Sequence, residues 1–173
     1  MGPVVIHGVP AHALLVHVVV VLVPLTAFAL LVCAVVPSWI RRLGIVLPGL
    51  ALVTLISVPV TTHAGEWLKR RVPSSPLVEK HADLGGTLWP WVLAMFLVAA
   101  AVWWAGRRSP FASETAQPGN WRTGTAILRV PLHVVAVVLA IVVAAGSVIQ
   151  LYRIGDAGAV SVWRGSFSDK PLG

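Results

Sequence analysis

Histidine is the residue type whose number and spacing in this chain best suit chemistry. Six histidines occur among 173 residues, and five fall near the ends of apolar segments that we place at one membrane face. Neutral imidazole ligates metal ions, and it exchanges protons near neutral pH. Because imidazole is uncommon beside lipid, several at one level predict a functional site. The five are His7, His12, His17, His63 and His81, whereas His133 lies at the other face.

Three kinds of site would use such a cluster. Two histidines from different helices would ligate a haem iron, three would hold Zn or Cu, and a set would relay protons. His17 is the foremost candidate, because it sits roughly 6 to 9 Å inside an apolar run and needs a buried partner there. We therefore expect His17, His63 and His81 to bind a cofactor, and a metal site would add His12.

Each histidine also has a plainer explanation. His7 and His12 fit solvated positions at the membrane interface, and His63 and His81 fit structural positions at helix ends. His12 and His17 are five residues apart, roughly 140° around a helix, so both cannot face one central ligand unless the helix begins after His12.

Three carboxylates lie near the histidines in the sequence. A carboxylate orients a ligating histidine by accepting its second ring N–H. We assign that supporting role to Glu66, Glu79 and Asp83, with solvated loop charges as the alternative.

Four apolar segments must position these side chains, and each has about the 20 apolar residues that a bilayer requires. A polar segment, 64–80, predicts a piece lying on the membrane surface, and Ser75 followed by Pro76 predicts a helix start. No internal repeat is evident. We predict an all-α integral membrane four-helix bundle, one transmembrane domain over 1–173, with spans at about 13–36, 43–62, 84–105 and 126–152.

Composition excludes several classes of protein. With 57% hydrophobic and 11% charged residues, the chain is not an ordinary soluble domain. The net charge of +7 lies in short clusters beside the apolar segments, which indicates membrane topology and no nucleic acid partner. Cys33 is the single cysteine and lies inside an apolar run. The phosphate-loop, HExxH, CxxC and serine-elbow motifs are absent, so we expect no enzyme.

Orientation depends on how the basic residues divide between the two faces. The 13 Lys and Arg residues split six to seven, so their count does not decide between the two orientations. The first loop is very short, the N-terminus is uncharged, and the acidic residues other than Glu114 fall on the side of the termini. We expect both termini outside the membrane.

The opening of the chain resembles that of a family of small bacterial membrane proteins catalogued as domain of unknown function 2231. Members open with a pattern similar to Leu-Pro-x-His-Pro-x-x-Val-His-Phe-Pro. This chain departs from it at Ala13, where Pro is common, and at Val18 and Val19, where Phe-Pro is common. It matches the pattern at Val9, Pro10, His12, Val16 and His17.

The middle and the tail extend the resemblance over nearly the whole chain. The middle element has Gly65, Glu66 and a helix start with His81, and the tail element has Gly155, Asp156, Gly158 and Ala159. The resemblance implies four spans and a bacterial plasma membrane, and it supplies no established activity. The histidine pattern is similar in kind to that of small membrane cytochromes, which is an analogy.

These observations favour a membrane electron-transfer protein with haem b or a transition metal on its outer-face histidines. Zn and Cu remain alternatives to haem b, and so does the absence of any cofactor. The expected surroundings are the lipid bilayer and a redox protein or membrane complex. Two other functions stay open: a non-catalytic structural or accessory subunit, and a metal or small-solute transporter.

Overall fold

The computed structural model describes residues 5–108 and 124–166, and it is built almost entirely of helices. Glu114, used in the orientation argument, lies outside these residues. Four helical segments of the described chain are long and apolar enough to cross a membrane: Ala11–Val35, Val46–Lys69, Pro76–Arg107 and Leu132–Trp163. The predicted all-α membrane protein with four spans is thereby confirmed.

A small hairpin precedes the first span. Strands β1 (Val5–Ile6) and β2 (Val9–Pro10) pair antiparallel around His7 and Gly8, whose φ angles are 49° and 80°. A two-residue hairpin turn of type I′ requires positive φ at both central residues, and histidine tolerates that region better than most side chains. His7 is therefore an exposed turn residue.

The first span is α1 (Ala11–Val35), which packs against both α3 and α6. Its buried side chains recur every three or four residues, which is the spacing of a bundle seam. They are Val19, Val23, Thr26, Leu30 and Cys33. Extended towards the N-terminus at the same spacing, this seam passes through His12.

A short helix and a tight turn connect the first two spans. Helix α2 (Pro37–Leu43) begins with Pro37 at its first turn and ends at Gly44, whose φ of 51° suits glycine. Helix α3 (Val46–Lys69) then returns antiparallel to α1. It continues through Lys69, so the first residues of the segment 64–80 continue the helix of the second span.

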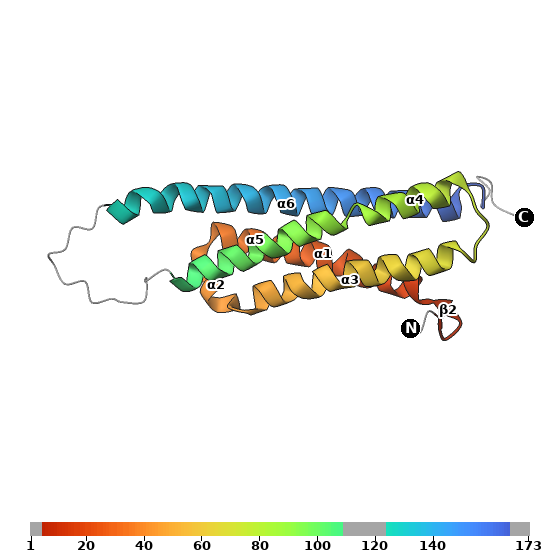
Figure 1. Ribbon diagram of the computed structural model, residues 1–173, viewed down its shortest axis with the longest axis horizontal. Helices are drawn as coiled ribbons and strands as arrows, with labels where there is room; N and C mark the ends of the chain where they lie inside the picture. The colour runs from red at the N-terminus through yellow and green to blue at the C-terminus, as the bar shows by residue number, and fades with distance from the viewer. Residues whose placement is uncertain (1–4, 109–123, 167–173) are drawn as a thin grey trace, which may run out of the picture.

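The third span consists of two helices nearly in line, α4 (Pro76–Gly86) and α5 (Trp89–Arg108) (Figure 1). The predicted start of α4 is confirmed: Ser75 is the N-cap, and its hydroxyl accepts a hydrogen bond from the Val78 N–H at 3.3 Å. Between the helices, Thr87 N–H donates to the Leu84 carbonyl, and the Thr87 hydroxyl accepts a hydrogen bond from Gln150 of α6.

The last helix, α6 (Gly124–Trp163), is the longest. At 1.5 Å per residue its 40 residues extend about 60 Å, which exceeds the roughly 30 Å of the hydrocarbon core. The expected interval 126–152 lies inside α6, which continues beyond it to Trp163. The C-terminal end of α6 thus lies beside α4, at the same end of the bundle as β1 and β2 (Figure 1).

The four spans close into a bundle in which α1 and α5 each contact α3 and α6. Among the described residues, the buried polar side chains are the hydroxyls of Thr26, Thr54, Thr61 and Ser147 and the amide of Gln150. Thr26 and Thr54 bond to each other at 2.7 Å between α1 and α3. Gly146 allows α6 to approach the Trp91 ring of α5. Large apolar side chains such as Val21, Phe28 and Leu132 are exposed on the outer surface, as expected for helices that face lipid.

Candidate functional site

Two histidines from different spans meet inside the bundle. His12 is the second residue of α1, and His81 lies in the middle of α4. The centroids of their imidazole rings are 6.2 Å apart, and the ring planes are inclined at 76°. Both side chains are half-buried.

His12 is held by helix α3. Its Nδ1 lies 3.0 Å from the carbonyl oxygen of Thr61. One turn later, the ring packs on Gly65, where an added Cβ would lie 2.9 Å from Cε1 and Nδ1 of the imidazole. A side chain in a helix covers the turn that precedes it. Glycine at position 65 therefore uncovers the Thr61 carbonyl and allows the imidazole to reach it.

His81 is held by helix α6 in the same way. Its Nδ1 lies 3.1 Å from the carbonyl oxygen of Ile154. Its ring packs on Gly158, where an added Cβ would lie 2.9 Å from Cε1 and 3.1 Å from Nδ1. For both histidines, the residue whose carbonyl accepts the hydrogen bond precedes the glycine by four residues.

These bonds determine which ring nitrogen is free. A carbonyl oxygen only accepts hydrogen bonds, so Nδ1 of each histidine must be the protonated nitrogen. In a neutral imidazole, Nε2 then holds an unprotonated lone pair. Neither Nε2 has a hydrogen-bond partner within the described residues. The site thus presents two ligand nitrogens, each on a ring fixed by a backbone carbonyl, as is usual for metal-bound histidine.

Each histidine forms one half-site with the carbonyl and the glycine that hold it. The two half-sites also have short sequence patterns in common. His12 and His81 each begin the pattern His-Ala-x-Leu, and Gly65 and Gly158 each end the pattern x-Ala-Gly. The alanines of the second pattern, Ala64 and Ala157, are both buried. The two half-sites are therefore alike in these short patterns as well as in their contacts.

His17 and His63 do not join the pair. His17 is exposed on the outer surface of α1, and its Nδ1 lies 2.7 Å from the Ala13 carbonyl of its own helix. His63 is exposed on α3, two residues before Gly65 but on a different side of the helix. The trio of His17, His63 and His81 is thus not brought together, and His12 takes the place expected for His17.

The three carboxylates are also directed elsewhere. Glu66, Glu79 and Asp83 are all exposed, and the hydrogen-bond partner of Glu79 is Ser74 at 3.3 Å. Backbone carbonyls accept the histidine N–H groups in their place. Among the residues that the structure describes, no group of three or more His, Cys, Asp or Glu side chains could hold a metal ion.

Depth in the apolar run does not identify which histidine is buried between the spans. It favoured His17 because that residue lies deeper than His12, but direction around the helix decides which imidazole faces the interior. The α1 sequence is apolar on all sides, which leaves its interior side ambiguous. The small or polar residues Thr26, Cys33 and Ala34 were the available signal, since they lie on the buried side that includes His12.

Comparison with known proteins places the chain by family alone. The family model described as "Predicted membrane protein (DUF2231)" matches residues 8–171, which include both half-sites. No curated protein and no solved structure matches the chain. Because this match covers nearly all of the sequence, the chain belongs to the DUF2231 family of predicted membrane proteins.

Proposed function

We propose that this protein is a membrane electron carrier in which His12 and His81 would hold the iron of a haem b. The observation that supports the proposal is the meeting of two imidazoles from different spans, with ring centroids 6.2 Å apart and each Nδ1 directed to a backbone carbonyl. Two imidazoles that held one metal ion between their Nε2 atoms, with metal–nitrogen bonds of about 2 Å, would have ring centroids roughly 6 Å apart.

The number of ligands favours haem iron over a zinc ion. Structural zinc takes four protein ligands and catalytic zinc takes three, whereas the described residues bring two imidazoles together. A porphyrin supplies four nitrogens of its own, so its iron needs only axial ligands from the protein. Cu also binds imidazole, and it is the alternative metal for a site of two nitrogens.

The position of the pair suits exchange of electrons with a partner at the membrane surface. His12 lies at the start of the first span, one turn or less from the end of the apolar segment. When bound, haem b supplies a one-electron couple. The residues of this chain hold the ligand rings through Thr61 and Ile154 and surround them with helix. The partner is then a redox protein or a membrane complex on the side of the termini.

An optical spectrum of the full-length protein tests this proposal. The protein is produced with haem supplied and purified in detergent. We expect a Soret band that is lost in His12→Ala and in His81→Ala. The control variants are His17→Ala and His63→Ala, which remove exposed histidines at the same end of the bundle, and we expect them to retain the band. The assignment would be contradicted if these two controls lost the band while His12→Ala and His81→Ala kept it.

A structural role is the competing function, because each Nδ1–carbonyl bond also joins two spans. Asparagine separates the two roles, since its amide N–H can donate to the carbonyl in place of Nδ1 while Nε2 is removed. We expect His12→Asn to unfold at nearly the wild-type temperature when both proteins are prepared without haem, and to lose the Soret band when haem is supplied. A folded wild-type protein without colour would exclude haem b, and one equivalent of Cu in it would support the copper alternative.

A further inference from the structure

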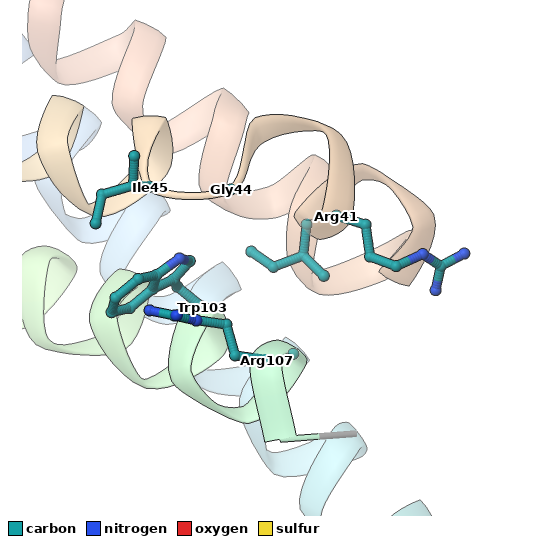
Figure 2. Close-up of a pocket in the computed structure, with 7 residues that line it drawn as sticks. Arg41, Gly44, Ile45, Trp103 and Arg107 are labelled. Atoms are coloured by element: carbon teal, nitrogen blue, oxygen red, sulfur yellow. The ribbon is translucent and has the colours of Figure 1, made fainter. Parts of the chain in front are cut away.

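A second site lies at the opposite end of the bundle from the histidines. A pocket of about 490 Å³ opens between the turn that joins α2 to α3 and the last turns of α5 (Figure 2). It is open to the surroundings on one side, and both basic and apolar groups line it. The lining residues include Arg41, Gly44, Ile45, Trp103, Gly106 and Arg107.

Two glycines shape this pocket. Gly106 lets α5 approach α2 closely, because an added Cβ there would lie 2.9 Å from Cγ2 of Ile40. Gly44 makes the turn with a φ of 51°. Beyond the turn, Ile45 is 66% exposed at the start of α3, so the mouth of the pocket adjoins an apolar surface that faces lipid.

The basic side chains here have no acidic neighbours in the described part of the chain. The described acidic residues, Glu66, Glu79, Asp83 and Asp156, lie on the segments that form the histidine end. At the pocket, the guanidinium carbon of Arg107 lies 4.9 Å from the centroid of the Trp103 ring. Figure 2 shows the Arg107 side chain folded back along that ring, whereas Arg41 extends outward from the rim.

Stacking on Trp103 prepares Arg107 to bind an anion. A guanidinium on an aromatic face loses little conformational freedom when it forms further hydrogen bonds, and its planar donors match the oxygens of a phosphate. Arg41 adds positive potential at the rim. At the end of a transmembrane bundle, the phosphates of lipid headgroups supply negative charge at the membrane surface.

We propose that this pocket binds the headgroup of an anionic phospholipid. The phosphate oxygens accept hydrogen bonds from Arg107, and the glycerol and the first acyl carbons lie along Trp103 and Ile45 towards the lipid-facing surface. The requirement for both an anion and an apolar tail follows from the two kinds of lining. A free phosphate shares only the first of these interactions.

Thermal unfolding of the full-length protein in mixed micelles tests the proposal. The probes are phosphatidylglycerol, phosphatidylcholine at the same mole fraction, and inorganic phosphate, all at one ionic strength. We expect the midpoint to rise with phosphatidylglycerol and to change little with the other two. In Arg107→Gln, about tenfold more phosphatidylglycerol should be needed for the same rise.

Arg71→Gln is the matched control, because Arg71 also stacks on a tryptophan, with its guanidinium carbon 3.8 Å from the centroid of Trp67, but at the histidine end. It should respond to phosphatidylglycerol as the wild type does. An equal loss in both variants would show non-specific attraction and overturn the proposal. An equal rise with phosphatidylcholine would also overturn it, as would a rise with inorganic phosphate that matches the rise with phosphatidylglycerol.

Discussion

His12 and His81 lie on different spans, yet their ring centroids are only 6.2 Å apart, and each ring is held through Nδ1 by a backbone carbonyl of another helix. The two partners of the His12–Thr61 bond are 49 residues apart in the sequence, and those of the His81–Ile154 bond are 73 residues apart. The pair therefore forms only when all four spans are assembled.

Gly65→Ala should displace His12 from the Thr61 carbonyl. The added methyl would lie 2.9 Å from two ring atoms, so either the imidazole or α3 must move. We expect the free energy of unfolding to fall by about 1 to 3 kcal/mol, the usual range for overpacking. Gly49→Ala in the same helix is the control, because nothing lies within 4 Å of its added Cβ. Thermal unfolding of both variants in detergent measures the difference, and equal midpoints would contradict the prediction.

Gly158→Ala should have the same effect on the other half-site, through His81. Its control is Gly155→Ala on the same helix, where an added Cβ meets nothing within 4 Å. If the two rings hold one cofactor, Gly65→Ala and Gly158→Ala should each weaken the Soret band, although neither alters a ligand. A band of full intensity in both variants would show that the positions of the rings do not matter.

The contact between Gly146 and Trp91, in the middle of the bundle, should be as sensitive to an added methyl group as the contacts of Gly65 and Gly158. An added Cβ at Gly146 would overlap the six-membered ring of the indole. We expect Gly146→Ala to destabilise the protein by at least about 1 to 3 kcal/mol. Trp91→Leu in the same background should restore part of the loss, because it removes the ring that the methyl meets. Failure of the second substitution to restore any stability would indicate that the clash is not the cause.

The buried hydroxyl pair should contribute modestly to stability. Thr26 and Thr54 bond to each other at 2.7 Å, and Thr54 also donates to the Leu50 carbonyl at 2.9 Å. Interhelical hydrogen bonds in membranes average about 0.6 kcal/mol in double-mutant cycles. A cycle of Thr26→Val and Thr54→Val should give a coupling energy of that size. A coupling near zero would mean that the two hydroxyls are satisfied separately.

Orientation is testable with reporters at both ends of the chain. The even number of spans predicts that fusions before Met1 and after Gly173 report the same side. We expect a periplasmic reporter to be active and a cytoplasmic reporter to be silent after Gly173. The opposite result would reverse the assignment of faces, and it would place the histidine pair on the cytoplasmic side.

The fold followed from the sequence more completely than the site did. Apolar length alone predicts four spans, and Ser75 and Pro76 predict the start of α4, because these signals are local. The convergence of His12 and His81 depends on which side of each helix packs inward. That choice is made by close contacts such as those of Gly65 and Gly158, which occur between segments far apart in the chain.

The shared pattern of the two half-sites has a consequence for how the site is completed. Helices α1 and α4 both start at the histidine end, and α3 and α6 both finish there, so the two halves run through the bundle in the same direction. Each half has one imidazole, its own carbonyl and its own glycine, but only one ligand. A single half would therefore present both imidazoles of the pair only if it associated with a second copy of itself.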